Sequence, residues 1–159
     1  MPPPLLIDLS RVDLSKRHAA SDQIYQLLPH RHEFQLLSGL CHLDTTTGKM
    51  VAFADIQPGD WWVRGHVPGR PLLPGVLMLE MAAQASAVAA KLSGTCDGFI
   101  AYGGVDQCKF RDTVVPPARL YLLVSGVDQR PRRIVSDVQG VVAGKLVFEA
   151  RITGMALPG

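Results

Sequence analysis

The segment Gly75–Leu92, GVLMLEMAAQASAVAAKL, predicts one long helix and decides the fold class of the chain. Its residues are mostly Leu, Met, Val and Ala, so it is apolar nearly all round and we expect it to be buried. Its many alanines let neighbouring backbone approach closely. Pro74 precedes the segment, and Ser93-Gly94 follows it as a pair typical of a helix C-terminus.

Strand-like segments flank this helix on both sides. Their short connections favour antiparallel neighbours. We therefore expect an α+β fold in which a sheet of about six antiparallel strands wraps one buried central helix. A short helix capped by Ser21-Asp22 and reaching Leu28 is expected before the sheet. The predicted strands are residues 36–44, 50–56, 98–110, 119–127, 133–142 and 145–152.

Length and composition are those of one globular domain. The chain has 159 residues, of which 47% are hydrophobic and 19% charged. No internal repeat or linker divides it. We expect an N-terminal arm over residues 1–20, irregular in structure, followed by a single domain over residues 21–159.

Several function classes are disfavoured by what the sequence lacks. A net charge of +2 gives no reason to expect nucleic acid as a partner. The three cysteines have no CxxC spacing and the N-terminus does not resemble a signal peptide, so we expect free thiols and a cytoplasmic location. Neither a nucleotide-binding loop nor a metalloprotease motif is present, and no cofactor is expected. The spacing of His30, His32 and His42 matches no standard metal site.

Glu80 is the most unusual residue of the predicted helix. A carboxylate at mid-bilayer is costly, so a soluble core helix is a better interpretation than a membrane span. A buried carboxylate without a partner costs several kcal/mol. Glu80 must therefore be paired or face a cavity, and Gln84 lies one turn further on the same face.

A constrained loop precedes the helix and contains His66, in Gly65-His66-Val67-Pro68-Gly69-Arg70-Pro71. Pro74-Gly75 then begins the helix, where free N–H groups can stabilise a developing oxyanion. Base, acid and oxyanion donor thus occur in one stretch. The pattern alone leaves other interpretations open, since His66 could simply bond within its loop and Glu80 could pair with an arginine.

Four motifs together carry a family resemblance. They are Leu27-Leu28-Pro29-His30-Arg31, then Gly65-His66-x-Pro68-Gly69-x-Pro71, then Pro74-Gly75-Val76-Leu77-x-x-Glu80, and finally Ala83-Gln84-Ala85. This set resembles the (3R)-hydroxyacyl-[acyl-carrier-protein] dehydratases of fatty-acid synthesis, of the FabZ and FabA type. The resemblance spans about residues 24–152.

The resemblance implies a hot dog fold and dehydration of 3-hydroxyacyl thioesters to trans-2-enoyl thioesters, without a cofactor. It assigns His66 as catalytic base, Glu80 as catalytic acid and the Gly75 N–H as donor to the thioester oxygen. Val76 and Gln84 are further candidates for supporting roles. In that family each site combines the histidine of one subunit with the acid of another. A homodimer, possible trimers of dimers and an acidic acyl carrier protein as partner are thus implied. The Glu at position 80 favours the dehydratase over the related isomerase.

Substrate contacts are predicted more loosely. Leu77, Met81 and Phe53 are candidates for an acyl tunnel, although core packing is the favoured interpretation of each one taken alone. Arginines at 64, 70, 130, 132 and 133 could form a basic rim for the carrier. The chain departs from the family at several positions, among them Val67 and Ser38-Gly39. An acyl-CoA hydratase, a thioesterase or a non-catalytic acyl-binding protein therefore remain alternatives.

Overall fold

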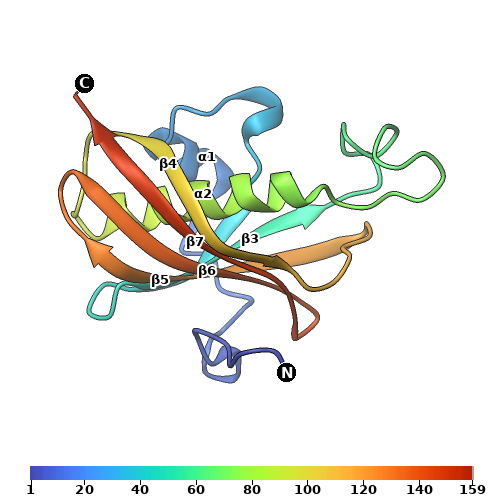
Figure 1. Cartoon of the computed structure of the whole chain (residues 1–159), viewed down its shortest axis with the longest axis horizontal. Helices are drawn as coiled ribbons and strands as arrows, with labels where there is room; N and C mark the ends of the chain where they lie inside the picture. Colours follow the sequence, from blue (N-terminus) through green and yellow to red (C-terminus); the bar gives the residue numbers. More distant parts are fainter. Residues whose placement is uncertain (159) are drawn as a thin grey trace.

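A computed structural model describes residues 1–158 and contains one seven-stranded antiparallel sheet and one long helix (Figure 1). The strand order is β1-β2-β3-β5-β6-β7-β4. The expected α+β architecture is confirmed, with a two-residue strand added to the six predicted ones. The elements are η1 Leu9–Arg11, β1 Ala19–Ala20, α1 Ser21–Leu27, η2 His32–Phe34, β2 Gly39–Asp44, β3 Lys49–Ile56, α2 Gly75–Leu92, β4 Phe99–Phe110, β5 Ala118–Gln129, β6 Arg133–Val142 and β7 Lys145–Leu157.

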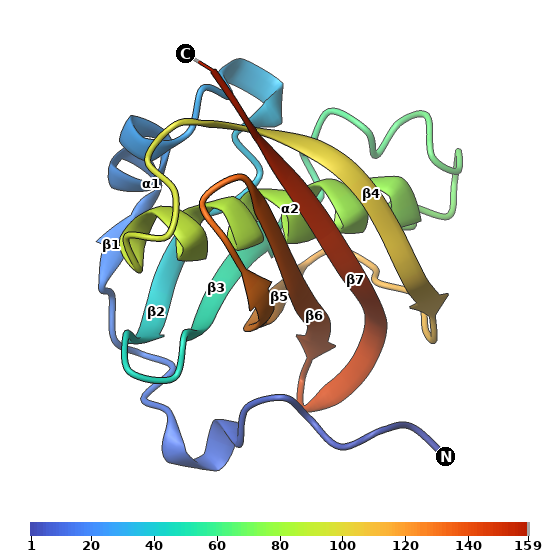
Figure 2. The same cartoon turned by 60° about the vertical axis from the view of Figure 1, so that its left-hand side comes forward.

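Helix α2 lies in the concave face of the curved sheet, which wraps around it (Figure 2). Its alanines at 82, 85 and 90 are fully buried, and they allow the strands to approach the helix closely. Gly94, with φ of +75°, ends the helix in the left-handed conformation that glycine adopts without steric cost. The central helix is therefore a core element, as its sequence predicts.

Side chains of the central strands alternate between two apolar layers. In β3, Met50 and Ala52 face α2, whereas Val51 and Phe53 face the opposite side of the sheet. That opposite side is covered by the N-terminal arm, whose Ile7 is buried against Phe53 and its neighbours. Strands covered on both faces are apolar at nearly every position, which explains the uninterrupted hydrophobic sequence of residues 50–54.

The arm is mostly irregular, but it is tied to the sheet at two points. Gln139, a buried side chain of β6, accepts a hydrogen bond from Leu6 N and donates one to the Pro4 carbonyl. Further along, β1 pairs with β2 through Ala19 and Ala20. Residues 1–20 therefore contain a short strand as well as irregular segments.

Local details differ from the sequence-based expectation in three places. Helix α1 begins at Ser21, but neither Ser21 nor Asp22 caps it; Ala20 is the cap residue, and its N–H donates to the Gln23 side chain. The strand expected from residue 36 begins at Gly39, although the Ser38 N–H still donates to the Phe53 carbonyl of β3. Strand β7 extends to Leu157, five residues further than predicted, where it pairs with β4.

Strand β4 forms one edge of the sheet and pairs only with β7 on its inner side. Apolar side chains along this edge are exposed, namely Phe99, Tyr102, Val105 and Phe110. An edge strand with open hydrogen-bonding groups is a natural surface for pairing with another chain.

Helix α2 is long and apolar enough to cross a membrane by length and composition. More than half of the same stretch is buried inside the fold. Its hydrophobicity is accounted for by its place in the core.

Candidate active site

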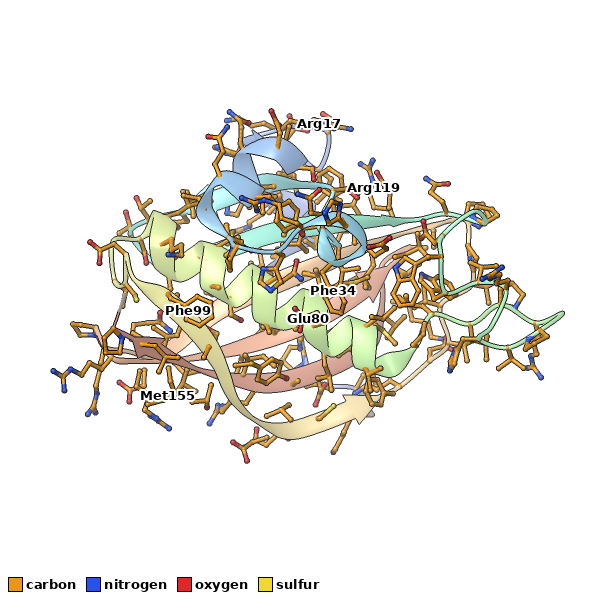
Figure 3. All side chains as sticks on the ribbon, turned by 90° about the horizontal axis from the view of Figure 1, so that it is seen from above. Arg17, Phe34, Glu80, Phe99, Arg119 and Met155 are labelled. Carbon is orange, nitrogen blue, oxygen red and sulfur yellow. The ribbon has the colours of Figure 1, made fainter. Side chains whose placement is uncertain are left out.

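Glu80 lies near the middle of α2, with β4 on one side of the helix and the segment that carries Phe34 on the other (Figure 3). Its side chain is 25% exposed and borders a pocket of about 410 Å³. The remaining pocket walls are mostly apolar. They comprise Leu28, Pro29, His30, Ala83, Gln84, Ser86, Ala87, Phe99, Ile100, Ala101, Tyr102, Ile134, Ile152, Thr153 and Gly154. The expectation that Glu80 must be paired or face a cavity is met in both ways.

A chain of buried and partly buried hydrogen bonds fixes the carboxyl group of Glu80. The Leu37 N–H donates to the Tyr25 hydroxyl (2.8 Å), which donates to Gln84 Oε1 (2.6 Å). Gln84 Nε2 then donates to the Phe34 carbonyl (2.9 Å) and to Glu80 Oε1 (3.0 Å). Because an amide nitrogen and a backbone N–H can only donate, the direction of every bond is determined. Gln84 therefore presents a donor, not an acceptor, to Glu80.

Burial raises the pKa of the Tyr25 phenol, with a smaller contribution from the charge of Glu80. The hydroxyl thus keeps its proton at any pH at which the fold is studied. Since the oxygen already accepts from Leu37, its own proton is free to be donated to Gln84. The network stays intact across the neutral range.

His66 is held in its loop by two contacts with Leu72. Its ring Nδ1 lies 2.8 Å from the Leu72 carbonyl oxygen, and the Leu72 N–H donates to the His66 carbonyl (3.0 Å). A carbonyl can only accept, so Nδ1 carries the proton and the neutral ring keeps a free lone pair on Nε2. The side chain is exposed. His66 is therefore oriented as a base whose reactive nitrogen is open to a ligand.

The start of α2 offers backbone donors. Leu77 N and Met78 N both bond to the Pro74 carbonyl, while the N–H groups of Gly75 and Val76 have no partner among the hydrogen bonds of residues 1–158. A Cβ on residue 75 would lie 2.9 Å from the Phe110 ring, so any larger residue there would have to displace that ring. These free N–H groups sit at the positive end of the helix.

Within one chain, the structure does not bring the three predicted groups together. The pocket at Glu80 is not lined by His66, Gly75 or Val76. The loop before α2, which carries His66, extends beyond the N-terminal end of that helix (Figure 1). His66 and the free N–H groups thus lie at the N-terminal end of α2, whereas Glu80 lies more than one turn further along the helix.

The three predicted tunnel residues do not line this pocket. Met81 is turned by about 100° from Glu80 around the helix and is buried in the core, as is Leu77. Phe53 is on the opposite face of the sheet, under the arm. Their place in an acyl tunnel stays a prediction. The α2 residues that line this pocket are Glu80, Ala83, Gln84, Ser86 and Ala87, of which 80, 83, 84 and 87 recur at helical spacing.

Sequence reasoning overlooked His30 and Tyr25. His30 Nε2 lies 3.2 Å from Glu80 Oε1, and the Tyr25 hydroxyl donates a hydrogen bond to Gln84 Oε1. The His-Arg motif drew attention to His30, but only as part of a family pattern. Tyr25 had no local signal, because its contact with Gln84 joins residues 59 positions apart in the chain.

No group of three or more His, Cys, Asp or Glu side chains within residues 1–158 could hold a metal ion. His30, His32 and His42 do not form such a group. The side chains at the candidate site are suited to proton transfer and hydrogen bonding.

Comparison with known proteins assigns the family. Residues 28–151 match the model of the FabA-like domain. A 3-hydroxyacyl-[acyl-carrier-protein] dehydratase FabZ of Enterococcus faecalis is 37% identical over 134 residues, which cover 84% of this chain and 94% of that protein. The FabZ of Protochlamydia amoebophila is 32% identical over 143 residues, covering 89% and 93% of the two chains.

The chain belongs to the FabZ/FabA family of dehydratases. The resemblance drawn from the four motifs is confirmed. Solved structures agree on the fold. A chain of the dehydratase heterocomplex ApeI:P from Xenorhabdus doucetiae superposes with a TM-score of 0.73 at 16% identity, covering 89% of this chain and 93% of that one. A hypothetical thioesterase with coenzyme A from Streptococcus pneumoniae gives 0.59 at 12% identity, covering 87% and 97%. At these identities the likeness shows the fold alone.

Proposed function

We propose that this FabZ/FabA family member dehydrates 3-hydroxyacyl thioesters carried by an acyl carrier protein, giving trans-2-enoyl thioesters. The observation that carries the proposal is the Glu80 carboxyl group, held by Gln84 at the wall of an otherwise mostly apolar pocket. An acid fixed beside an apolar cavity suits a substrate with one reactive hydroxyl on an alkyl chain. The FabZ relatives support the same reaction.

The reaction requires one base, one acid and one oxyanion donor. His66 Nε2 takes the proton from C2 of the substrate, while the Gly75 N–H stabilises the negative charge that develops on the thioester oxygen. The double bond forms between C2 and C3 as the C3–O bond breaks. Glu80 gives its proton to the departing hydroxyl, which leaves as water.

The proton on Glu80 belongs on Oε2. Gln84 donates to Oε1, so Oε1 must act as an acceptor. No residue between 1 and 158 forms a hydrogen bond with Oε2. The oxygen without a protein partner is therefore the one left for the substrate.

We further propose that two copies of the chain complete each site. One chain separates His66 from Glu80, and its β4 edge is open and apolar. Pairing of two β4 edges around a two-fold axis would place the His66 loop of one subunit beside the Glu80 pocket of the other. Supporting this, the same edge carries Phe99 and Tyr102, which are both pocket walls and exposed side chains.

The acyl carrier protein would approach the His66 loop. Arg64 and Arg70 are exposed in that loop and have no acidic partner among the described ion pairs, from Arg11–Asp8 to Arg151–Asp137. By contrast, Arg130 and Arg133 are already paired with Asp128. We therefore assign carrier attraction to the first two arginines.

The three free thiols of the described residues suit a reducing compartment such as the cytoplasm.

The test is a turnover assay with a 3-hydroxyacyl thioester on acyl carrier protein, following the enoyl product. His66→Ala and Glu80→Gln should each lower kcat by roughly 10²–10⁴-fold, the usual contribution of a general base or acid. Glu33→Gln and His18→Ala change the same residue types at exposed positions and should retain full activity. Near-normal turnover in Glu80→Gln would contradict the assignment. Hydrolysis of the thioester, or binding without turnover, would favour the thioesterase or acyl-binding alternative.

A further inference from the structure

A second histidine touches the catalytic acid. His30 lies between α1 and η2, and its Nε2 is 3.2 Å from Glu80 Oε1. This is the same oxygen that accepts the hydrogen bond from Gln84. His30 also lines the Glu80 pocket, and its side chain is 29% exposed.

The surroundings of the ring indicate which nitrogen carries the proton. Nδ1 is buried and has no hydrogen-bond partner within residues 1–158. Buried N–H groups without a partner are rarer than unpaired acceptors. The proton of the neutral ring is thus expected on Nε2, from which it can be donated to Glu80 Oε1.

The backbone around His30 is rigidly held. Arg31 Nη1 donates to the carbonyl groups of Tyr25, Leu28 and His30, at 3.0, 2.9 and 2.7 Å. These bonds satisfy the exposed carbonyls at the end of α1 and tie the next residues to that helix. Pro29 further restricts the segment. Such anchoring is what accurate placement of an imidazole requires.

We propose that His30 is a positioning residue for Glu80. Together with Gln84 it supplies two donors to Oε1, which fixes the carboxyl rotamer and confines the acidic proton to Oε2. Gln84 alone would hold the carboxyl group through one bond and leave it free to rotate about that contact. This inference rests on the proposed dehydratase function, because it concerns the acid of that reaction.

The test compares two substitutions of His30. Gln can place its amide N–H near the position of Nε2, whereas Asn reaches only the position of Nδ1. His30→Asn should lower kcat roughly 10–100-fold, the effect of losing one hydrogen bond to an ionisable group, with KM little changed. His30→Gln should recover most of this loss. His32→Asn, an exposed change in the same segment, should match the wild-type enzyme.

The outcomes separate this inference from the proposed function. Wild-type turnover with an unchanged kcat in His30→Asn would overturn the positioning role and leave the dehydratase assignment standing. An equal loss in the Asn and Gln variants, with circular dichroism showing both folded, would also overturn it, since donation at Nε2 would then not matter. If the Asn variant does not fold, the kcat of the Gln variant decides. Absence of wild-type turnover would remove the proposed function and this inference with it.

Discussion

Glu80 can occupy an otherwise apolar helix because its neighbours satisfy one of its oxygens and leave the other open. Gln84, fixed by Tyr25, determines which oxygen that is. The arrangement requires a polar hydrogen-bond network inside the fold. Such a network stabilises a fold only when every polar group in it has a hydrogen-bond partner. In this protein each member of the Leu37–Tyr25–Gln84 chain has one.

Removal of the Tyr25 hydroxyl tests this network. Tyr25→Phe leaves Gln84 Oε1 and the Leu37 N–H without their partner, so we expect a loss of roughly 1–3 kcal/mol in the free energy of unfolding. Turnover should fall as well, because Gln84 is then free to turn its oxygen toward Glu80. Urea denaturation measures the first effect. Tyr102→Phe, a matched change at an exposed position, should alter stability by far less.

Among the elements, helix α2 contributes two features to the proposed site, and they lie at different positions along the helix. Its first turn presents the free N–H groups of Gly75 and Val76, and its middle carries Glu80. From Glu80 to Ala87 the pocket follows the helix for about 10 Å, at 1.5 Å per residue. Small residues at 83 and 87 leave the space that an acyl chain would fill.

The length of this pocket predicts a chain-length effect. Ala87→Leu fills the end of the pocket furthest from Glu80 along the helix. Turnover of short 3-hydroxyacyl thioesters should persist, while kcat/KM for long chains should fall by roughly tenfold or more relative to the short ones. A series of substrates of increasing length on the same carrier measures this ratio, with the short substrate as internal control. An equal loss at all lengths would show that the acyl chain lies elsewhere.

The helices and strands could be predicted from the sequence more reliably than the direction in which each apolar side chain faces. Helix α2 was predictable because eighteen consecutive residues share one environment, and the strands because turns and hydrophobic runs alternate. The face on which an apolar strand residue lies was harder to predict, because Phe53 is on a strand whose two faces are both buried. The face of the sheet that carries Phe53 is covered by the N-terminal arm. This contact joins residues far apart in the chain, so no local pattern reveals it.

The residues of the candidate site that lie close together in the sequence could be predicted, whereas those that come from distant segments could not. His66, Gly75 and Glu80 occur within fifteen residues, so their motif is visible in the chain. His30 and Tyr25 reach Glu80 and Gln84 from about 50 to 60 residues away. No periodicity connects such pairs, so only the fold reveals them.

For the molecule as a whole, the central feature is that the proposed base and the proposed acid lie apart within one chain. The pocket and Glu80 lie beside the β4 edge, and His66 lies in a loop beyond the N-terminus of α2. A two-fold pairing that joins them also covers the exposed side chains of β4. A complete site therefore requires that His66 and Glu80 act across two subunits.

The most direct measurement is the activity of a mixed dimer. Chains with His66→Ala and chains with Glu80→Gln, carrying different affinity tags, are co-expressed and the dimer bearing both tags is isolated. In this dimer one site has both His66 and Glu80 and the other has neither, so its turnover should be about half that of the wild type. Homodimers of each variant should be nearly inactive. A mixed dimer no more active than those homodimers would contradict the shared site.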